Sequence, residues 1–177
     1  MLDRTLGDAY PSRSQWARRV TEGWAADNLF CAACSSSSLT PHQANRAVED
    51  YQCPRCSRRV QLKAKNGRIG ASVSNSAFAK KRSAILAGRA PDYCFMGYDR
   101  DALLVEDLIW VPGHFMTLSV ISERKPLRET ARRAGWVGSN IHLDRIPAQG
   151  KIPVVVGGRI CSKAVVRHQF AELAFLR

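Results

Sequence analysis

Two Cys-x-x-Cys pairs constrain the fold of this chain more than any other feature of its sequence. Cys31 and Cys34 form the first pair, Cys53 and Cys56 form the second, and residues 35–52 separate them. Zinc prefers four thiolates at the corners of a tetrahedron, and two such pairs supply them when they meet in space. Because thiolates then fill every position, we expect a structural zinc ion with no bound water. The alternative is a set of buried or redox-active thiols.

The second pair lies between two expected strands, residues 46–52 and 58–65. A turn centred on Arg55 and Cys56 would place Asp50 opposite Gln61, and directly opposite side chains in an antiparallel pair lie close together. Lys63 leaves the same face of its strand as Gln61 because the two are separated by one residue. We therefore expect Asp50, Gln61 and Lys63 to converge, unless the turn shifts the register by one residue.

This convergence suits hydrolysis of a phosphodiester bond. Oxygen ligands hold Mg²⁺, which polarises a phosphate and activates water. A nearby lysine orients the water and offsets charge in the transition state. The spacing Asp…Gln-x-Lys is common by itself, and it also fits the polar face of a surface strand.

The hydrophobic periodicity predicts a single α/β domain with a mixed central β-sheet flanked by helices. In the helix expected at 12–29, Trp16, Val20 and Trp24 share one face. In the last helix, Val165, Val166, Phe170 and Leu173 are expected to point inward. The other expected helices are 75–87 and 162–175, and the other expected strands are 93–98, 103–111, 140–143 and 152–156.

The net charge of +12 predicts a polyanionic partner. Nucleic acid is the expected one, because each neutralised phosphate releases a counterion; the alternative is a basic surface that is merely solvated. No apolar stretch is long enough to cross a bilayer and the N-terminus does not resemble a signal peptide, so we expect a cytoplasmic protein.

Positive charge is concentrated in one segment that ends at a tryptophan. Residues 124–133 contain a single anion, Glu129, and Trp136 follows. Arginine side chains suit phosphates and guanine edges, so we expect DNA contact here. The alternative is a solvated face with Trp136 in the core. The five cations are Arg124, Lys125, Arg128, Arg132 and Arg133.

Several motifs resemble those of the DpnI-like, or Dam-replacing, restriction endonucleases. The longest is Arg124-Lys125-Pro126-Leu127 followed by Thr130-Ala131-Arg132-Arg133-Ala134-Gly135-Trp136. Shorter matches are Thr21-Glu22-x-Trp24, Asn45-Arg46-x-Val48-x-Asp50, Leu62-Lys63-x-Lys65-x-Gly67 and the closing Phe175-Leu176-Arg177. The resemblance extends over nearly the whole chain.

The resemblance implies the PD-(D/E)xK nuclease fold with an inserted four-cysteine zinc site. It implies that Asp50, Gln61 at the acidic position of the motif and the Leu62 carbonyl bind Mg²⁺, that Lys63 is the catalytic lysine, and that the four cysteines bind zinc. It also implies a prokaryotic protein. It further implies a type II restriction endonuclease that cuts double-stranded DNA at GATC when the adenine carries an N6-methyl group. Trp136 would then contact that methyl group.

Two departures from the family pattern bear on function. Gln61 stands where the family usually has glutamate, so one charge at the expected Mg²⁺ site is lost, and Glu22 is an auxiliary acid that could replace it. The alternative role of Glu22 is helix packing. The family's winged-helix domain would begin at Arg177, so we expect one nuclease domain, 1–177, with a zinc clip at 31–56. The other reading is a zinc-stabilised module that binds modified DNA with weak or lost cleavage.

Overall fold

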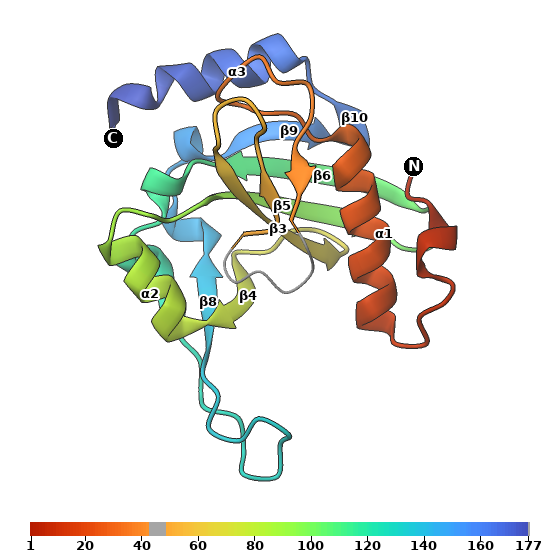
Figure 1. Ribbon diagram of the computed structural model, residues 1–177, viewed down its shortest axis with the longest axis vertical. Coiled ribbons are helices and arrows are strands. Elements are labelled where there is room, and N and C mark those ends of the chain that lie inside the picture. Colours follow the sequence, from red (N-terminus) through yellow and green to blue (C-terminus); the bar gives the residue numbers. More distant parts are fainter. Residues whose placement is uncertain (43–48, 177) are drawn as a thin grey trace.

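A curled, mixed seven-stranded sheet forms the centre of the molecule (Figure 1). The computed structural model describes residues 1–42 and 49–176. Strands β3 and β5 are parallel, and the other neighbouring pairs are antiparallel. The strand order is β1 (Thr40–Pro41), β2 (Tyr51–Gln52), β3 (Arg59–Asn66), β5 (Asp92–Asp99), β6 (Leu104–Val111), β9 (Ile152–Val156) and β10 (Arg159–Ile160).

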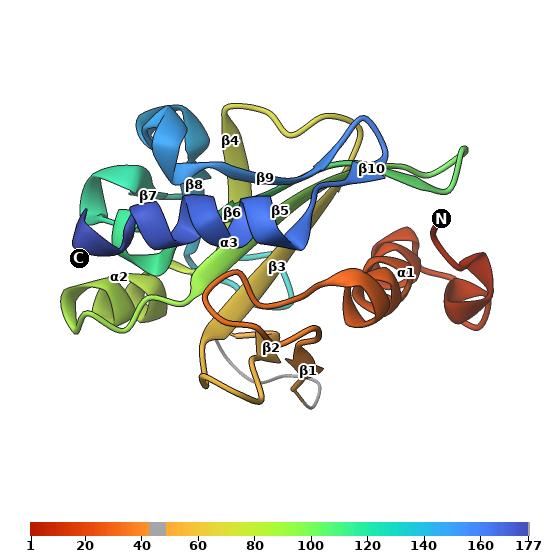
Figure 2. The ribbon, with the colours of Figure 1, turned by 90° about the horizontal axis from the view of Figure 1, so that it is seen from above.

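A second, three-stranded antiparallel sheet and three helices surround the large sheet (Figures 1 and 2). The small sheet has the order β4 (Ser72–Ala77), β8 (Gly138–His142) and β7 (Ile121–Glu123). The helices are α1 (Arg13–Asn28), α2 (Phe78–Leu86) and α3 (Lys163–Glu172). Short 3-10 turns lie at Arg4–Gly7, Gly113–Phe115, Leu118–Val120, Leu143–Arg145, Ala148–Gly150 and Ala174–Leu176.

The large sheet is apolar on both faces, which explains the uninterrupted apolar run of β5. Cys94 and Met96 join the core cluster that includes residues of α1 and α3. Tyr93 and Phe95, which alternate with them, join a separate cluster that includes Ile141 of the small sheet. Gln61 pairs with Tyr93 in the β3–β5 register, and this pairing positions it beside that second cluster.

The structure confirms the mixed α/β class and most of the expected elements. Trp16, Val20 and Trp24 are buried on α1, as expected. Residues 75–77 belong to strand β4, so α2 begins only at Phe78. Val165 is 52% exposed, contrary to expectation, whereas Val166, Phe170 and Leu173 are buried.

The strand expected at 46–52 lies partly outside the described residues, and β2 covers only its last two. In the described part of the chain, no helix has the length and apolar character needed to cross a membrane.

Candidate active site

The four paired cysteines converge as the sequence predicts. Their sulfur atoms all lie within 4.8 Å of one another. The Cys31 and Cys56 Sγ atoms are 3.6 Å apart, and those of Cys34 and Cys53 are 3.5 Å apart. A tetrahedral site with Zn–S bonds of ~2.3 Å has sulfur–sulfur edges of about 3.8 Å, so this cluster fits a zinc ion.

The cluster joins the end of α1 to the β2–β3 turn. Cys31 follows the C-terminus of α1, while Cys53 lies at the start of the turn. Arg167 of α3 donates hydrogen bonds to the carbonyl oxygens of Cys31, at 3.2 Å, and Ser36, at 2.8 Å. Burial opposes ionisation of the Cys53 thiol, but the backbone N–H groups of Cys56 and Arg55 outweigh it and lower its pKa to about 6.

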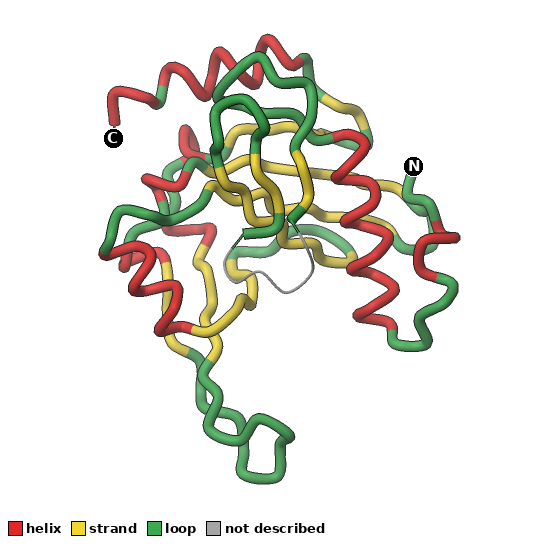
Figure 3. Tube along the Cα trace, in the orientation of Figure 1, coloured by secondary structure: helices red, strands yellow, loops and turns green. Residues whose placement is uncertain are grey.

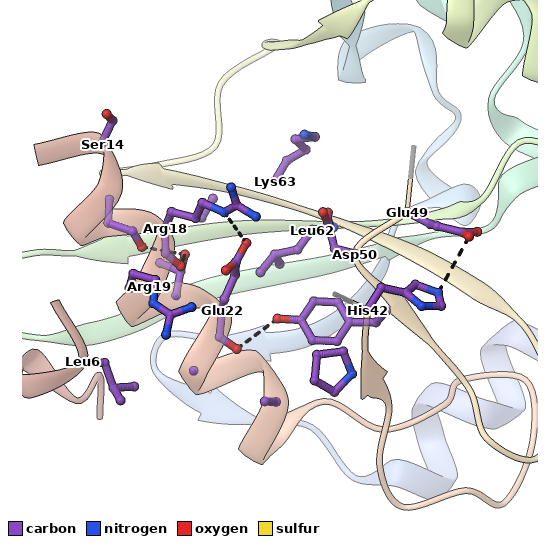
Figure 4. A pocket seen from close by; sticks show the side chains of 17 residues that line it. Leu6, Ser14, Arg18, Arg19, Glu22, His42, Glu49, Asp50, Leu62 and Lys63 are labelled. Carbon is purple, nitrogen blue, oxygen red and sulfur yellow. Dashed lines mark hydrogen bonds and ion pairs between the residues drawn. The ribbon is translucent and has the colours of Figure 1, made fainter. Parts of the chain in front are cut away.

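Beside this clip lies a cavity of about 840 Å³ between α1 and the β2–β3 hairpin (Figure 4). The Tyr51 hydroxyl donates to the Glu22 carbonyl oxygen at 2.9 Å and ties the hairpin to the helix. Charged groups from both elements face the cavity. Its charged and titratable lining residues are Arg18, Arg19, Glu22, His42, Glu49, Asp50 and Lys63, and the Tyr51 and Leu62 side chains also line it.

Asp50 lies at the start of the β2–β3 hairpin, beside β3. The pairs Tyr51–Val60 and Gln52–Arg59 have the expected register. Asp50 lies just outside β2, and its N–H donates at 2.9 Å to the carbonyl oxygen of Val60, the partner of Tyr51, so the ladder does not continue to an Asp50–Gln61 pair. The Asp50 Oδ2 atom accepts a hydrogen bond from the Leu62 N–H at 2.9 Å. The backbone of β3 therefore fixes the orientation of this carboxylate at the cavity wall.

Lys63 also lines this cavity (Figure 4). Burial lowers the pKa of Lys63, and the negative charges of Asp50 and Glu22 partly oppose this effect. A buried lysine whose pKa is lowered by desolvation and raised by nearby carboxylates is typical of a functional site.

Glu22 also faces the cavity, and it is paired with an arginine that the sequence analysis did not single out. Arg18 Nε donates to Glu22 Oε1 at 2.7 Å across one turn of α1. This hydrogen bond, together with the charge of Glu22, raises the pKa of Arg18. The i,i+4 spacing of Arg18 and Glu22 was the signal that could have identified the pair.

Gln61 is not among the residues that line the cavity. Its side chain is buried, with only 4% of the residue exposed. The Gln61 Oε1 atom accepts from Asn75 Nδ2 at 3.4 Å and from Lys81 Nζ at 3.5 Å. Burial, with the neighbouring ammonium of Lys63, lowers the pKa of Lys81 to about 7. Of the three residues expected to converge, Asp50 and Lys63 meet at the cavity, and Gln61 turns toward α2 and β4.

The carboxylates that line the cavity are those of Glu22, Glu49 and Asp50, and carboxylate oxygens are the ligands that Mg²⁺ takes. Mg²⁺ is commonly held by one or two carboxylates while it keeps several waters. Asp50 retains an oxygen that its hydrogen bond to Leu62 does not use, and the cavity is large enough for hydrated ions. The Gln61 oxygen already has two donors, so it does not complete such a site as arranged here.

The basic segment forms a long loop that extends the β7–β8 hairpin away from the rest of the molecule (Figures 1 and 3). The Arg124 N–H donates to the Gly138 carbonyl oxygen, and the Leu127 N–H to that of Trp136, each at 3.0 Å. All five cations of the segment are exposed.

Trp136 is half-buried at the base of this loop. The guanidinium of Arg133 lies over its ring at 4.7 Å from the centroid. A Cβ atom at Gly138 would lie 2.9 Å from the Trp136 ring, so the ring packs directly on that glycine. Trp136 therefore belongs to the loop and is not a deeply buried core anchor.

These features define an α/β protein with a four-cysteine cluster that could hold zinc and a charged cavity between a helix and a hairpin. The chain matches the model of the DpnI family, described as the Dam-replacing family, over residues 1–177, and it belongs to that family. The family is one of restriction endonucleases that act on methylated DNA.

Proposed function

We propose that this protein is a type II restriction endonuclease that hydrolyses phosphodiester bonds of double-stranded DNA at adenine-methylated GATC sites. Residues 1–177 would form one nuclease domain of the PD-(D/E)xK type, dependent on Mg²⁺ and stabilised by zinc. The observation that supports this proposal most directly is the meeting of Asp50 and Lys63 at one cavity, beside a hairpin whose turn lies in the cysteine cluster.

The residues at the cavity suit distinct parts of the reaction. When bound by Asp50, the Leu62 carbonyl and the auxiliary acid Glu22, Mg²⁺ would supply Lewis-acid polarisation of the phosphate and a more acidic water. The Lys63 ammonium would orient the attacking water and offset negative charge on the phosphorane-like transition state. The Leu62 N–H, by holding Asp50 Oδ2, keeps the carboxylate in place throughout.

The extended loop is the proposed DNA-binding element. Its exposed cations would contact phosphates, and such contacts position a protein on DNA without reading its sequence. The ring of Trp136 would contact the adenine methyl group, since apolar contact in the major groove is how proteins sense such a group. The half-buried position of Trp136 leaves part of the ring accessible for this contact.

Digestion of one plasmid, prepared with and without adenine methylation, tests the proposal. With Mg²⁺ the wild-type protein should cut only the methylated copy, and sequencing of the ends should show GATC. Asp50→Asn and Lys63→Ala should each reduce cutting by at least about a hundredfold while retaining zinc. Arg159→Ala, an exposed cation on β10, is the matched control and should cut normally. Wild-type rates in both site variants would overturn the site assignment.

A second candidate function is binding of modified DNA with weak or lost cleavage. The engagement of Gln61 by Asn75 and Lys81 favours it, because one expected metal ligand is then occupied. A gel-shift assay combined with a cleavage assay over a range of Mg²⁺ and Mn²⁺ concentrations separates the two functions. Methyl-dependent binding without nicking at any concentration would support the binding module.

A further inference from the structure

Lys81 is a buried cation that the proposed reaction does not use. It lies on α2, and only 2% of the residue is exposed. Its ammonium contacts two neutral groups, the Gln61 side-chain oxygen and the Tyr93 hydroxyl, and lies 4.6 Å from the centroid of the Tyr93 ring. In residues 1–42 and 49–176, no carboxylate forms an ion pair with it. Burial of such a charge is costly, so an uncompensated lysine here requires a reason.

Residues around Lys81 form hydrogen bonds with one atom, the Gln61 Oε1 atom. Gln61 and Tyr93 are paired in the β3–β5 register and therefore present their side chains on one face of the sheet. Asn75, from β4, adds a second donor to Gln61 Oε1. Asn75 is itself 7% exposed, so water does not readily replace its hydrogen bond. Two donors from two different elements thus hold an amide oxygen that belongs to the same strand as Lys63.

This cluster is next to the cavity but separate from its lining. Gln61 lies between Val60, which pairs with β2, and Leu62, whose N–H holds Asp50. The charges of Lys63 and Asp50 are close enough to act on Lys81. Gln61 precedes Leu62 and Lys63, which line the cavity, so its side-chain oxygen is held at the edge of the cavity by the donors from Asn75 and Lys81.

We propose that Lys81 is a positioning residue that holds the Gln61 side-chain oxygen away from the divalent metal, which leaves the metal to Asp50 and Glu22. This inference rests on the proposed function and deepens it, because it names which side chains do and do not bind the ion. Replacement of Lys81 by methionine removes the charged donor and keeps the apolar stem, so Gln61 Oε1 retains only its hydrogen bond from Asn75 and can turn toward the metal.

Mn²⁺ titration calorimetry on the zinc-loaded full chain tests this proposal without DNA. Lys81→Met should lower the Mn²⁺ dissociation constant about tenfold, in line with one added oxygen ligand and one removed positive charge. The matched control, Lys80→Met, changes an exposed lysine one residue away on α2 and should leave the dissociation constant unchanged.

A double-mutant cycle separates positioning from simple charge removal. In a Gln61→Met background, Lys81→Met should change the dissociation constant by less than about threefold, because no side-chain oxygen remains to be released. Equal tightening in both backgrounds would overturn the proposal and assign Lys81 a purely electrostatic effect, and so would the absence of tightening in the single variant. Lys81→Leu provides a second removal of both the charge and the donor if Lys81→Met does not fold. Cleavage is not part of this measurement, so a protein that shows the cycle but does not cut DNA would refute only the nuclease proposal.

Discussion

Removal of zinc should lower the free energy of unfolding of the whole domain. The size of the decrease can be estimated from the length of the loop that the metal closes. The metal would link Cys31 to Cys56, so it closes a loop of about 26 residues in the unfolded chain. Loop-closure entropy for a cross-link of this length corresponds to about 3.5 kcal/mol at 25 °C. A domain of this size loses ~2–4 °C of melting temperature per kcal/mol, so zinc removal should lower Tm by roughly 7–14 °C.

Calorimetry of the protein before and after treatment with a zinc chelator measures this effect, with zinc content determined by mass spectrometry. Cys53→Ser should lose zinc and reproduce the decrease in Tm. Cys161→Ser, which alters a half-buried cysteine outside the cluster, is the matched control and should retain both zinc and Tm. A zinc-free protein that melts within about 2 °C of the zinc-loaded protein would refute the reasoning.

Zinc removal should also abolish cleavage, because Asp50 lies three residues before Cys53 in the clipped hairpin. Readdition of zinc, in the continued presence of Mg²⁺, should restore it. Recovery with Mg²⁺ alone would show that the clip does not hold the catalytic hairpin in place.

Three further predictions concern the loop and the core. Arg133→Ala should weaken binding to methylated and unmethylated DNA alike and reduce the slope of log K against log salt by ~1 if it contacts a phosphate; an unchanged slope in fluorescence titrations would exclude that contact. Trp136→Ala should abolish the preference for methylated duplex in competition assays and Trp136→Phe should retain part of it, whereas an intact preference in both would exclude Trp136 as the methyl sensor. Asp92→Ala should lower the free energy of unfolding by ~3–5 kcal/mol, because it leaves Arg58 and the Trp110 indole N–H without their buried acceptor; urea unfolding measures this, and a change below about 1 kcal/mol would contradict it.

Local patterns predicted most of the fold. Cys-x-x-Cys spacing indicated the cluster, and strand periodicity with a tight turn gave the register of Tyr51 and Gln52 against β3, although the ladder does not continue to Asp50. The predicted start of α2, at residue 75, was wrong because Ser72–Ala77 forms a strand that pairs with β8, which lies more than 60 residues later in the chain. Val165 was placed inward by periodicity, yet α3 buries a narrower stripe than the pattern suggests.

In the candidate site, the sequence predicted only those side-chain positions that follow from alternation along a single strand. Side-chain alternation put Gln61 and Lys63 on one face, but it could not show that Asn75 and Lys81 reach Gln61 from β4 and α2. Arg18 was missed because a helical arginine four residues before a glutamate usually indicates only a solvated ion pair. Contacts between side chains of different elements depend on how those elements pack, and a pattern of neighbouring residues in the sequence does not predict that packing.

The two ends of the projecting loop meet where Arg124 bonds to Gly138, and the strands below them are anchored by Ile121 and Ile141 in the interior. Because the loop is closed at its base, residues 125–137 can be replaced by the corresponding loop of another protein. The exchange would disturb neither the cysteine cluster nor the cavity lined by Asp50 and Lys63. On the proposed function, exchange of this loop among relatives would change DNA target preference and leave the proposed catalytic residues in place.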